Sequence, residues 1–476
     1  MDGSQKKNKK AVIIGAGPAG LAAGYELSKH GVETVILEKS DSVGGLARTI
    51  EHEGYLFDVG PHRFYTKSKI VGDLWQNLLG PDFLIVPRLT RIFYRKKFFS
   101  YPVKPFQVLL NLGPVTSALV MISYIKSKIS LRNLKPKTFE EWITKNFGSR
   151  LFEMFFKTYT EKVWGIPCDQ IGAEWASQRI KNLSFWSTLW NAFGSIKGKD
   201  VKSLIEEFNY PKYGAGMMYE KMAEEIKKNG GQILFGEDVS SIEYKDNQII
   251  SVTSRGAIGG NKKWQAGYFF SSMPMTELVK KMSPIPLPEI GKAANSLYFR
   301  SHIAVNLIVK KANPFPDNWI YIHEPDIKMA RLSNFKNFSK HMSKDDNTPV
   351  CCEYFVFKDD EMWRKSDEEL KILASNELEK LGFLEEGDVV GGFVVREEFA
   401  YPTYYIGHKK PFEMIKNFFR KFKNITLIGR GGTYRYNNQD HSLEMGILAA
   451  RSIIESKEYD LDKIGDEQEY YEEHKG

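Results

Sequence analysis

Apolar runs alternate with helical patterns at both ends of the chain. Residues 11–14 form an apolar run, and a glycine-rich turn separates it from a helical pattern that reaches about residue 30. A second apolar run covers residues 33–37. Towards the C-terminus, an apolar run at 425–428 precedes a helical pattern at about 442–455. Strands that alternate with helices are typical of βαβ units, so both ends predict parts of a parallel sheet.

The central part of the chain shows other patterns. Residues 106–205 are mostly helical in pattern and rich in Trp and Phe, whereas strand patterns dominate from about residue 296 to 405. Further strands are predicted at 53–57 and 263–272. Basic and aromatic residues alternate over 88–104, which predicts a hairpin with one packed and one solvated face. A groove for single-stranded nucleic acid is the less favoured alternative.

The composition narrows the class of protein. With 42% hydrophobic and 26% charged residues, the 476-residue chain is neither disordered nor collagen-like. Its net charge of +8 is compatible with anionic small ligands or a membrane surface, and is too small to indicate nucleic acid. Cys168, Cys351 and Cys352 form neither a disulfide framework nor a zinc motif, and the first ten residues are polar and basic. A cytoplasmic protein without a metal site is therefore expected.

One uncharged stretch raises the question of a membrane contact. Residues 105–125 carry no charge, which is nearly the length of a membrane span. Polar residues interrupt the stretch, and Gly113 with Pro114 marks a turn between two helices. A buried helical pair is the favoured interpretation. A helix lying on the membrane, flanked by Lys126 and Lys128, stays open, and so does a homo-oligomer.

The first glycine-rich turn has the spacing of a nucleotide site. Gly15, Gly17 and Gly20 stand between a predicted strand and a predicted helix. The first glycine makes the tight turn, the second lets a diphosphate approach the backbone, and the third allows the helix to pack closely on the strand. Glu38 ends the next strand, where a carboxylate can accept hydrogen bonds from a ribose 2′-hydroxyl. The sequence therefore predicts a dinucleotide.

Two further segments favour FAD over NAD. Gly45 and Arg48 follow the acidic strand end in a loop that looks like the one with which FAD enzymes hold the diphosphate. Gly429 and Arg430 come between a late strand and a helix, whose N-terminus could face the flavin pyrimidine edge. The predicted cofactor residues are Gly15, Gly17, Gly20, Glu38, Gly45, Arg48, Gly60, Val239, Gly429 and Arg430.

Together these residues resemble the amine-oxidase and protoporphyrinogen-oxidase superfamily of FAD proteins, and most of all its UDP-galactopyranose mutase branch. The resemblance covers nearly the whole chain, and its branch-specific part rests on residues 60–66, 159–165, 179–180, 330–338 and, after Tyr401, 429–436. The last island, Gly-Arg-Gly-Gly-Thr-Tyr-Arg-Tyr, is the most specific. Among the departures from the pattern, Tyr65 replaces a histidine, and Asn438 replaces a carboxylate.

The resemblance implies an α/β fold in which a Rossmann-type FAD-binding domain carries an inserted helical region and a mixed or antiparallel-sheet substrate domain. The expected division is FAD-binding for 1–90, 209–285 and 416–456, a mainly helical cap for 91–208, a β-sheet substrate domain for 286–415, and an acidic tail for 457–476.

The resemblance also implies an activity. In this branch, N5 of reduced FAD attacks the anomeric carbon of a nucleotide sugar and displaces the nucleotide diphosphate. The sugar ring opens through a flavin–sugar iminium and recloses with the other ring size, and the diphosphate returns to the anomeric carbon, so pyranose and furanose interconvert. The reductant would be NAD(P)H or another donor. The implied catalytic residues are Arg179 and Arg331 at the substrate diphosphate, Tyr401 and Tyr436 as hydroxyl donors, and His62 against the flavin. The implied substrate-binding residues are Tyr159, Trp164, Arg179, Arg331, Tyr401, Tyr436 and Asn438.

Other functions stay open at this point. An oxidase or dehydrogenase of the same superfamily would act on an amine, a porphyrinogen, a polyene or a lipid-linked sugar, and the uncharged stretch at 105–125 is the feature that favours it. A non-enzymatic protein stabilised by FAD is a third hypothesis.

Overall fold

A parallel five-stranded sheet joins segments that lie far apart in the chain. The computed structural model describes residues 10–101, 111–173, 175, 207–256 and 259–465. The strand order is β20-β13-β1-β2-β9, and every neighbouring pair is parallel. The strands are β1 (Lys10–Ile14), β2 (Glu33–Leu37), β9 (Gln232–Leu234), β13 (Tyr268–Ser271) and β20 (Ile425–Leu427).

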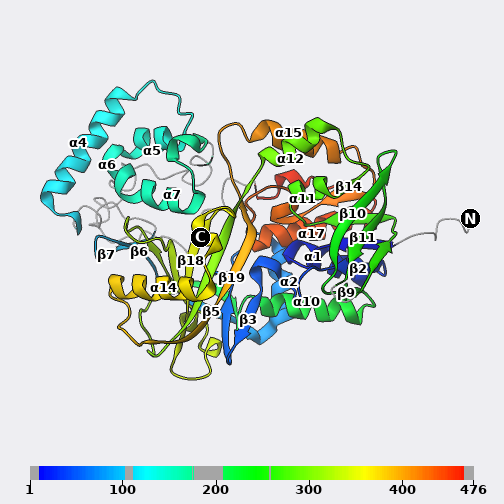
Figure 1. Ribbon diagram of the computed structural model, residues 1–476, viewed down its shortest axis with the longest axis horizontal. Helices are drawn as coiled ribbons and strands as arrows, with labels where there is room; N and C mark the ends of the chain where they lie inside the picture. The colour runs from blue at the N-terminus through cyan, green and yellow to red at the C-terminus, as the bar shows by residue number, and fades with distance from the viewer. Residues whose placement is uncertain (1–9, 102–110, 174, 176–206, 257–258, 466–476) are drawn as a thin grey trace, which may run out of the picture.

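Both faces of the parallel sheet are covered. Ile13, Ile36 and Phe270 point to one face, where they share a core with α1 (Pro18–Lys29), α2 (Lys69–Leu79), α10 (Gly216–Lys228) and α17 (Gln439–Ile454). Val12 and Val35 point to the other face, which packs on a four-stranded sheet and on three helices (Figure 1). Burial on both sides explains why these strands read as continuous apolar runs. The covering elements are β10 (Asp238–Lys245), β11 (Gln248–Arg255), β12 (Asn261–Trp264), β14 (Met282–Ser283), α11 (Met275–Lys280), α12 (Pro288–Ser296) and α15 (Lys409–Phe419).

A larger, mostly antiparallel sheet stands beside the first. Its seven strands follow the order β19-β15-β18-β17-β16-β6-β7, with only the β16–β6 pair parallel. Helix α14 (Asp367–Leu381) covers one face through Leu370, Ala374 and Leu378. The strands are β6 (Thr90–Tyr94), β7 (Lys97–Ser100), β15 (Phe299–Val309), β16 (Trp319–Ile322), β17 (Arg331–Asn334), β18 (Thr348–Val356) and β19 (Val389–Pro402).

A helical unit packs on the end of this sheet that carries β6 and β7. Its core contains Val120 and Tyr124 of α4 with Phe99 of β7, and it reaches Tyr401 and Tyr436. The unit comprises α4 (Pro114–Ser130), α5 (Phe139–Phe147), α6 (Ser149–Leu151), a π-helical turn (Phe152–Lys157) and α7 (Thr158–Trp164). The described residues also contain two small antiparallel strand pairs and two short α-helices: β3 (Thr49–His52) with β4 (Tyr55–Asp58), β5 (Phe83–Pro87) with β8 (Glu207–Pro211), α13 (Glu361–Arg364) and α16 (Gly429–Gly432).

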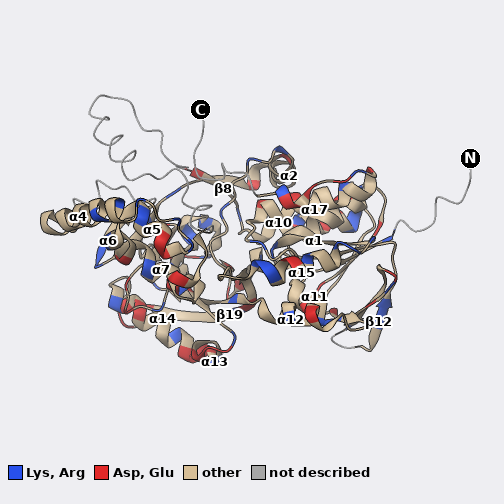
Figure 2. Cartoon of the chain, turned by 90° about the horizontal axis from the view of Figure 1, so that it is seen from above, with Lys and Arg blue, Asp and Glu red and all other residues tan. Residues whose placement is uncertain are grey.

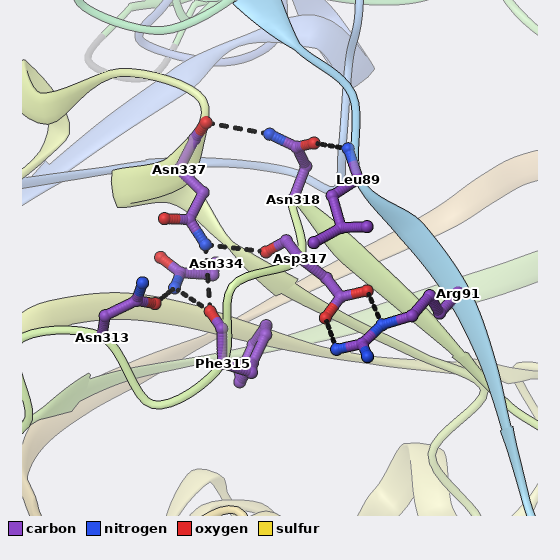
Figure 3. Close-up of polar contacts among 8 residues, drawn as sticks. All are labelled: Leu89, Arg91, Asn313, Phe315, Asp317, Asn318, Asn334 and Asn337. Carbon is purple, nitrogen blue, oxygen red and sulfur yellow. Dashed lines mark hydrogen bonds and ion pairs between the residues drawn. The ribbon is translucent and has the colours of Figure 1, made fainter. Parts of the chain in front are cut away.

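A buried polar network fixes the start of β6 to the segment that precedes β16 (Figure 3). The Asp317 carboxylate, fully buried, accepts hydrogen bonds from Nε and Nη2 of Arg91 at 2.8 and 2.6 Å. Oδ1 of Asn318 accepts from the Leu89 N–H at 2.7 Å, and its Nδ2 donates to the Asn337 carbonyl at 2.8 Å. Because these groups are satisfied inside the protein, the start of the hairpin is held in one position.

The structure confirms the predicted fold class and corrects some predicted elements. The hairpin over 88–104 is present as β6 and β7. The strand predicted at 53–57 is wrong at its start, because Glu53 and Gly54, with φ of 54° and 80°, form the turn between β3 and β4. The strand predicted at 263–272 is two strands, β12 and β13, which belong to different sheets. Helix α14, which was not predicted, lies in the region where strand patterns dominate the sequence.

Two absences hold for the part of the chain that the structure describes. No helix there is long and apolar enough to cross a bilayer. No cluster of three or more metal-ligating side chains occurs among the same residues, and the three cysteines are free and buried.

Candidate functional site

The glycine-rich turn between β1 and α1 forms a cradle. A Cβ on Gly20 would lie 1.9 Å from the Gly15 carbonyl oxygen, so only glycine lets α1 pack this closely on the turn. Gly15 has a φ of +97°, which also favours glycine. By contrast, a Cβ on Gly17 would meet no atom within 4 Å. The open space beside Gly17 at the N-terminus of α1 fits a diphosphate.

Glu38 ties this turn to the end of β2. Its Oε2 accepts from the Ala16 N–H at 2.6 Å, and its Oε1 accepts from the N–H and hydroxyl of Ser40 at 2.8 and 2.7 Å. A carboxylate has about four acceptor positions, so Glu38 can still accept from a ribose hydroxyl. Val239 of β10 is buried and shares a core with Leu37, the last residue of β2.

The second glycine loop packs directly on the first. The Gly44 N–H donates to the Ala16 carbonyl at 2.9 Å, and a Cβ on Gly45 would lie 3.2 Å from the Cα of Gly17. Nη1 of Arg48 donates to the Gly45 carbonyl at 2.8 Å, while Nη2 pairs with Glu397 of β19 at 2.6 Å. A cation therefore lies beside the cradle and joins it to the large sheet.

The segment at Gly429 and Arg430, near the C-terminal end of the chain, packs against α1 beside the cradle. Gly429 has a φ of +72°, and its Cβ would lie 3.0 Å from that of Ala19 in α1. The Arg430 guanidinium donates to the carbonyls of Asn437 and Ala400 and lies 4.9 Å from the ring centre of Tyr401. The cradle at Gly17 and the clustered loops fit a bound dinucleotide such as FAD.

We expect Glu38→Ala to weaken FAD retention while leaving the fold intact. The substitution removes three hydrogen bonds that hold the cradle, as well as an acceptor for the ribose. The flavin-to-protein absorbance ratio after gel filtration measures the effect. Glu33→Ala, at the exposed start of β2, is the matched control and should keep wild-type flavin content. Equal flavin content in the two variants would contradict the assignment of Glu38.

A buried ion pair forms the centre of a second cluster. Glu353 of β18 is fully buried and accepts from Nε and Nη2 of Arg331 on β17 and from Nε2 of His302 on β15, the last at 3.0 Å. Burial alone would raise the pKa of Glu353, but Arg331 and His302 outweigh it and lower the pKa to about 2. Glu353 is therefore ionised and holds the Arg331 side chain in place.

The turn after β4 brings His62 to this ion pair. A Cβ on Gly60 would lie 2.8 Å from Oε1 of Glu353, so the backbone passes close to the carboxylate. Nδ1 of His62 is buried without a hydrogen-bond partner in the described structure. Burial, together with the charge of Arg430, lowers the pKa of His62 to about 3, so its ring is neutral. An unpartnered polar atom at this position is suited to contact a cofactor or ligand.

Aromatic rings line the same region. Tyr401 and Tyr436 stack with ring centres 5.3 Å apart. Burial raises the pKa of Tyr401, and the nearby charge of Arg331 acts in the opposite direction. Tyr159 of α7 stacks on His323 at 4.8 Å, and burial raises its pKa well above the ordinary value. Trp164, at the end of α7, lies 6.4 Å from Tyr436.

The structure thus brings together six residues that the sequence assigned to the pocket or the cofactor. These are His62, Tyr159, Arg331, Tyr401, Arg430 and Tyr436. Trp164 lies at the edge of the group. Asn438 is instead the exposed N-cap residue of α17, and its N–H donates to Nδ1 of His441. Arg179 lies outside the described residues.

Glu353 and His302 were not predicted. Both stand in the interior of long apolar strands, β18 and β15, where every residue is buried. A charged residue inside an apolar strand has to be paired, and that was the available signal. The partner of Glu353, Arg331, is more than 20 positions away in the sequence, so the pair becomes visible only when β17 and β18 are placed side by side.

Comparisons with known proteins agree with this geometry. Residues 18–454 match the family described as flavin containing amine oxidoreductases. A probable UDP-galactopyranose mutase of Klebsiella pneumoniae is 28% identical over 171 residues, which cover 35% of this chain and 44% of that protein. A 1-hydroxycarotenoid 3,4-desaturase of a Flavobacterium species is 26% identical over 270 residues, or 52% of this chain and 54% of that protein. The chain spans about half the length of these curated relatives.

A solved structure extends the likeness of the fold to almost the whole chain. The crystal structure of a reduced UDP-galactopyranose mutase superposes with a TM-score of 0.80 at 22% sequence identity. The superposition covers 94% of each chain. At this identity the likeness concerns the fold.

Proposed function

The chain belongs to the family of flavin-containing amine oxidoreductases, and from that premise we propose that it is an FAD-dependent isomerase that interconverts the pyranose and furanose forms of a nucleotide sugar. The observation that carries the proposal is the anchored Arg331. Its Nε and Nη2 are held by Glu353, and among the described residues its Nη1 has no hydrogen bond. A fixed cation with one free edge, surrounded by tyrosines, suits an anionic leaving group.

Residues of this chain would have distinct roles in the reaction. Arg331, through Nη1, would bind the substrate diphosphate and stabilise the charge that develops when the bond to the anomeric carbon breaks. The hydroxyls of Tyr159 and Tyr401 would donate to the same diphosphate or to the sugar. Reduced FAD, when bound, would supply a nucleophile for the anomeric carbon. His62, neutral beside Gly60, would orient the cofactor without adding a charge.

The position of Arg331 changes the expected mode of phosphate recognition. Arginine often binds phosphate with two parallel hydrogen bonds. Here the paired edge of Arg331 already faces Glu353. A single hydrogen bond from Nη1, together with the charge, is what remains for the diphosphate. The partner that completes its recognition is proposed to be Arg179.

Oxidation of a polyene or another apolar substrate is the second candidate. It is supported by the likeness to a carotenoid desaturase over 52% of the chain. The pocket residues argue against it, because an apolar substrate has no use for a free guanidinium edge.

Redox dependence distinguishes the two candidates. An isomerase ends with its flavin in the state in which it began, so turnover of a nucleotide sugar should appear only after reduction by dithionite or NAD(P)H, without stoichiometric oxygen uptake. An oxygen electrode and a peroxide assay run alongside product analysis test this. If turnover instead tracks peroxide formation with an amine, porphyrinogen or polyene, the oxidase hypothesis replaces the isomerase.

A further inference from the structure

Helix α4 (Pro114–Ser130) is apolar on two opposite faces. Val120 and Tyr124 are buried against the core of the helical unit. On the other side, five aliphatic side chains are exposed by 37 to 73%: Val115, Leu119, Ile122, Ile125 and Ile129. At about 100° per residue, these five fall in a stripe roughly 120° wide, centred opposite Val120 and Tyr124. We call this stripe the outer face of α4.

Positive charge surrounds the outer face. Residues 111–139 contain five lysines and arginines and no aspartate or glutamate: Lys126, Lys128, Arg132, Lys135 and Lys137. Lys126 is exposed and falls within the apolar stripe itself, and Lys128 follows one half-turn later. Figure 2 shows α4 at the end of the molecule, with basic and without acidic residues along it. Apolar and basic side chains thus share one surface.

Among the described residues, the neighbours of α4 leave this surface accessible. The helix lies at the outer edge of the helical unit, on the side away from the parallel sheet (Figure 1). Its 17 residues make a rod about 26 Å long that packs on α5 and α6 along its inner side. An exposed apolar stripe of this extent is unusual for a surface helix of a globular protein.

We propose that the outer face of α4 is a docking surface for a lipid bilayer with anionic headgroups, on which the helix lies parallel to the membrane plane. The aliphatic side chains enter the boundary between headgroups and acyl chains, while the lysines pair with the anionic headgroups. A second copy of this chain is the less suitable occupant. In a two-fold symmetric pair of outer faces, the Lys126 side chains would approach each other with no acidic residue of 111–139 to compensate.

Vesicle binding by the full holoprotein tests the proposal. Purified protein should co-sediment with vesicles of phosphatidylglycerol and phosphatidylcholine in equal parts, and added sodium chloride should weaken the binding. The triple variant Ile122→Ser, Ile125→Ser and Ile129→Ser should bind roughly tenfold or more weakly. Because these side chains are exposed, the variant should keep wild-type FAD content and Tm. Lys126→Glu, a single change on the surface, should weaken binding in the same direction.

A matched control removes three isoleucines that are equally exposed elsewhere. Ile85→Ser, Ile285→Ser and Ile372→Ser change side chains exposed by 67, 90 and 53% that lie outside α4. This control should bind vesicles like the wild type. The proposal is overturned if the wild type does not bind, or if both triple variants lose binding equally. It is also overturned if sedimentation shows a dimer that only the α4 variant dissociates, since the occupant is then a second copy.

Discussion

Replacing Glu353 by glutamine is expected to lower the free energy of unfolding by about 3 kcal/mol, since it leaves the charge of Arg331 without its partner. Glu353 is fully buried, whereas the Arg331 side chain keeps 17% of its surface exposed, so the lower end of the range for broken buried pairs applies. Urea unfolding monitored by tryptophan fluorescence measures the change.

The pH dependence of stability should report the same ion pair. Folding lowers the pKa of Glu353 from 4.5 to about 2. The stabilisation is therefore complete above pH 4.5 and is lost as the pH falls towards 2, which corresponds to about 3 kcal/mol. The difference in stability between wild type and Glu353→Gln should be constant at neutral pH and shrink in acid.

An exposed ion pair serves as the control. Lys358 and Glu398 are 2.8 Å apart, with side chains 60 and 35% exposed, so Glu398→Gln should cost less than about 1 kcal/mol. Glu353→Gln combined with Arg331→Met should recover part of the loss, because the unpaired charge is then gone. If the Glu353→Gln variant is as stable as the Glu398→Gln variant, the buried pair of Glu353 and Arg331 does not contribute to stability as expected.

The second large effect is expected on catalysis. Arg331→Ala should remove about 2–4 kcal/mol of transition-state stabilisation with a nucleotide-sugar substrate, because one fixed charge donor to the diphosphate is lost. Arg331→Lys should recover only part of the activity, since a lysine ammonium can neither pair with Glu353 through two parallel bonds nor present the same free edge. The ratio kcat/KM of each variant measures the loss.

The design must separate catalysis from folding, because Arg331→Ala also leaves Glu353 with His302 as its remaining partner. Flavin content and Tm therefore accompany every rate. The bare sugar, which lacks the diphosphate, should show no difference between wild type and either variant. A folded Arg331→Ala variant with near wild-type kcat/KM would contradict the assignment of Arg331 to the substrate diphosphate. The same experiment on Arg179, which the sequence pairs with Arg331, tests the second proposed cation.

Local sequence patterns predicted the nucleotide cradle better than the substrate region. Gly15, Gly17 and Gly20 lie within six residues of each other. Gly15 and Gly20 meet steric demands that the spacing already implies, and Gly17 leaves the open space that the spacing assigns to a diphosphate. Glu38 follows at the end of the next strand. These features depend on one βαβ unit, so a short window of sequence is enough to find them.

The ion pair and the sheet boundaries depend on contacts between distant segments. Arg331 was singled out by resemblance, but nothing local in the sequence indicates that Glu353 occupies its paired edge. Likewise, the buried apolar residues of α14 are spaced among polar ones, so the helix was not recognised between the neighbouring strand patterns. Strands β12 and β13 were predicted as one strand, because their assignment to different sheets depends on tertiary packing. A buried helical pair was the favoured interpretation of residues 105–125. The first part of the stretch, up to residue 110, lies outside the described residues, and in α4 the exposure of Ile122 and Ile125 shows that the helix is not buried on all sides.

The proposed isomerisation is tested most directly by analysis of ring forms. Anaerobic, dithionite-reduced holoprotein is incubated with UDP-galactose, UDP-glucose or GDP-mannose, and the pyranose and furanose nucleotides are separated by chromatography. The account predicts that at least one nucleotide pyranose is converted to its furanose isomer of equal mass, by the reduced protein and not by the oxidised one. Unchanged pyranose from each of these nucleotide sugars, with a folded protein that retains reduced flavin, would contradict it.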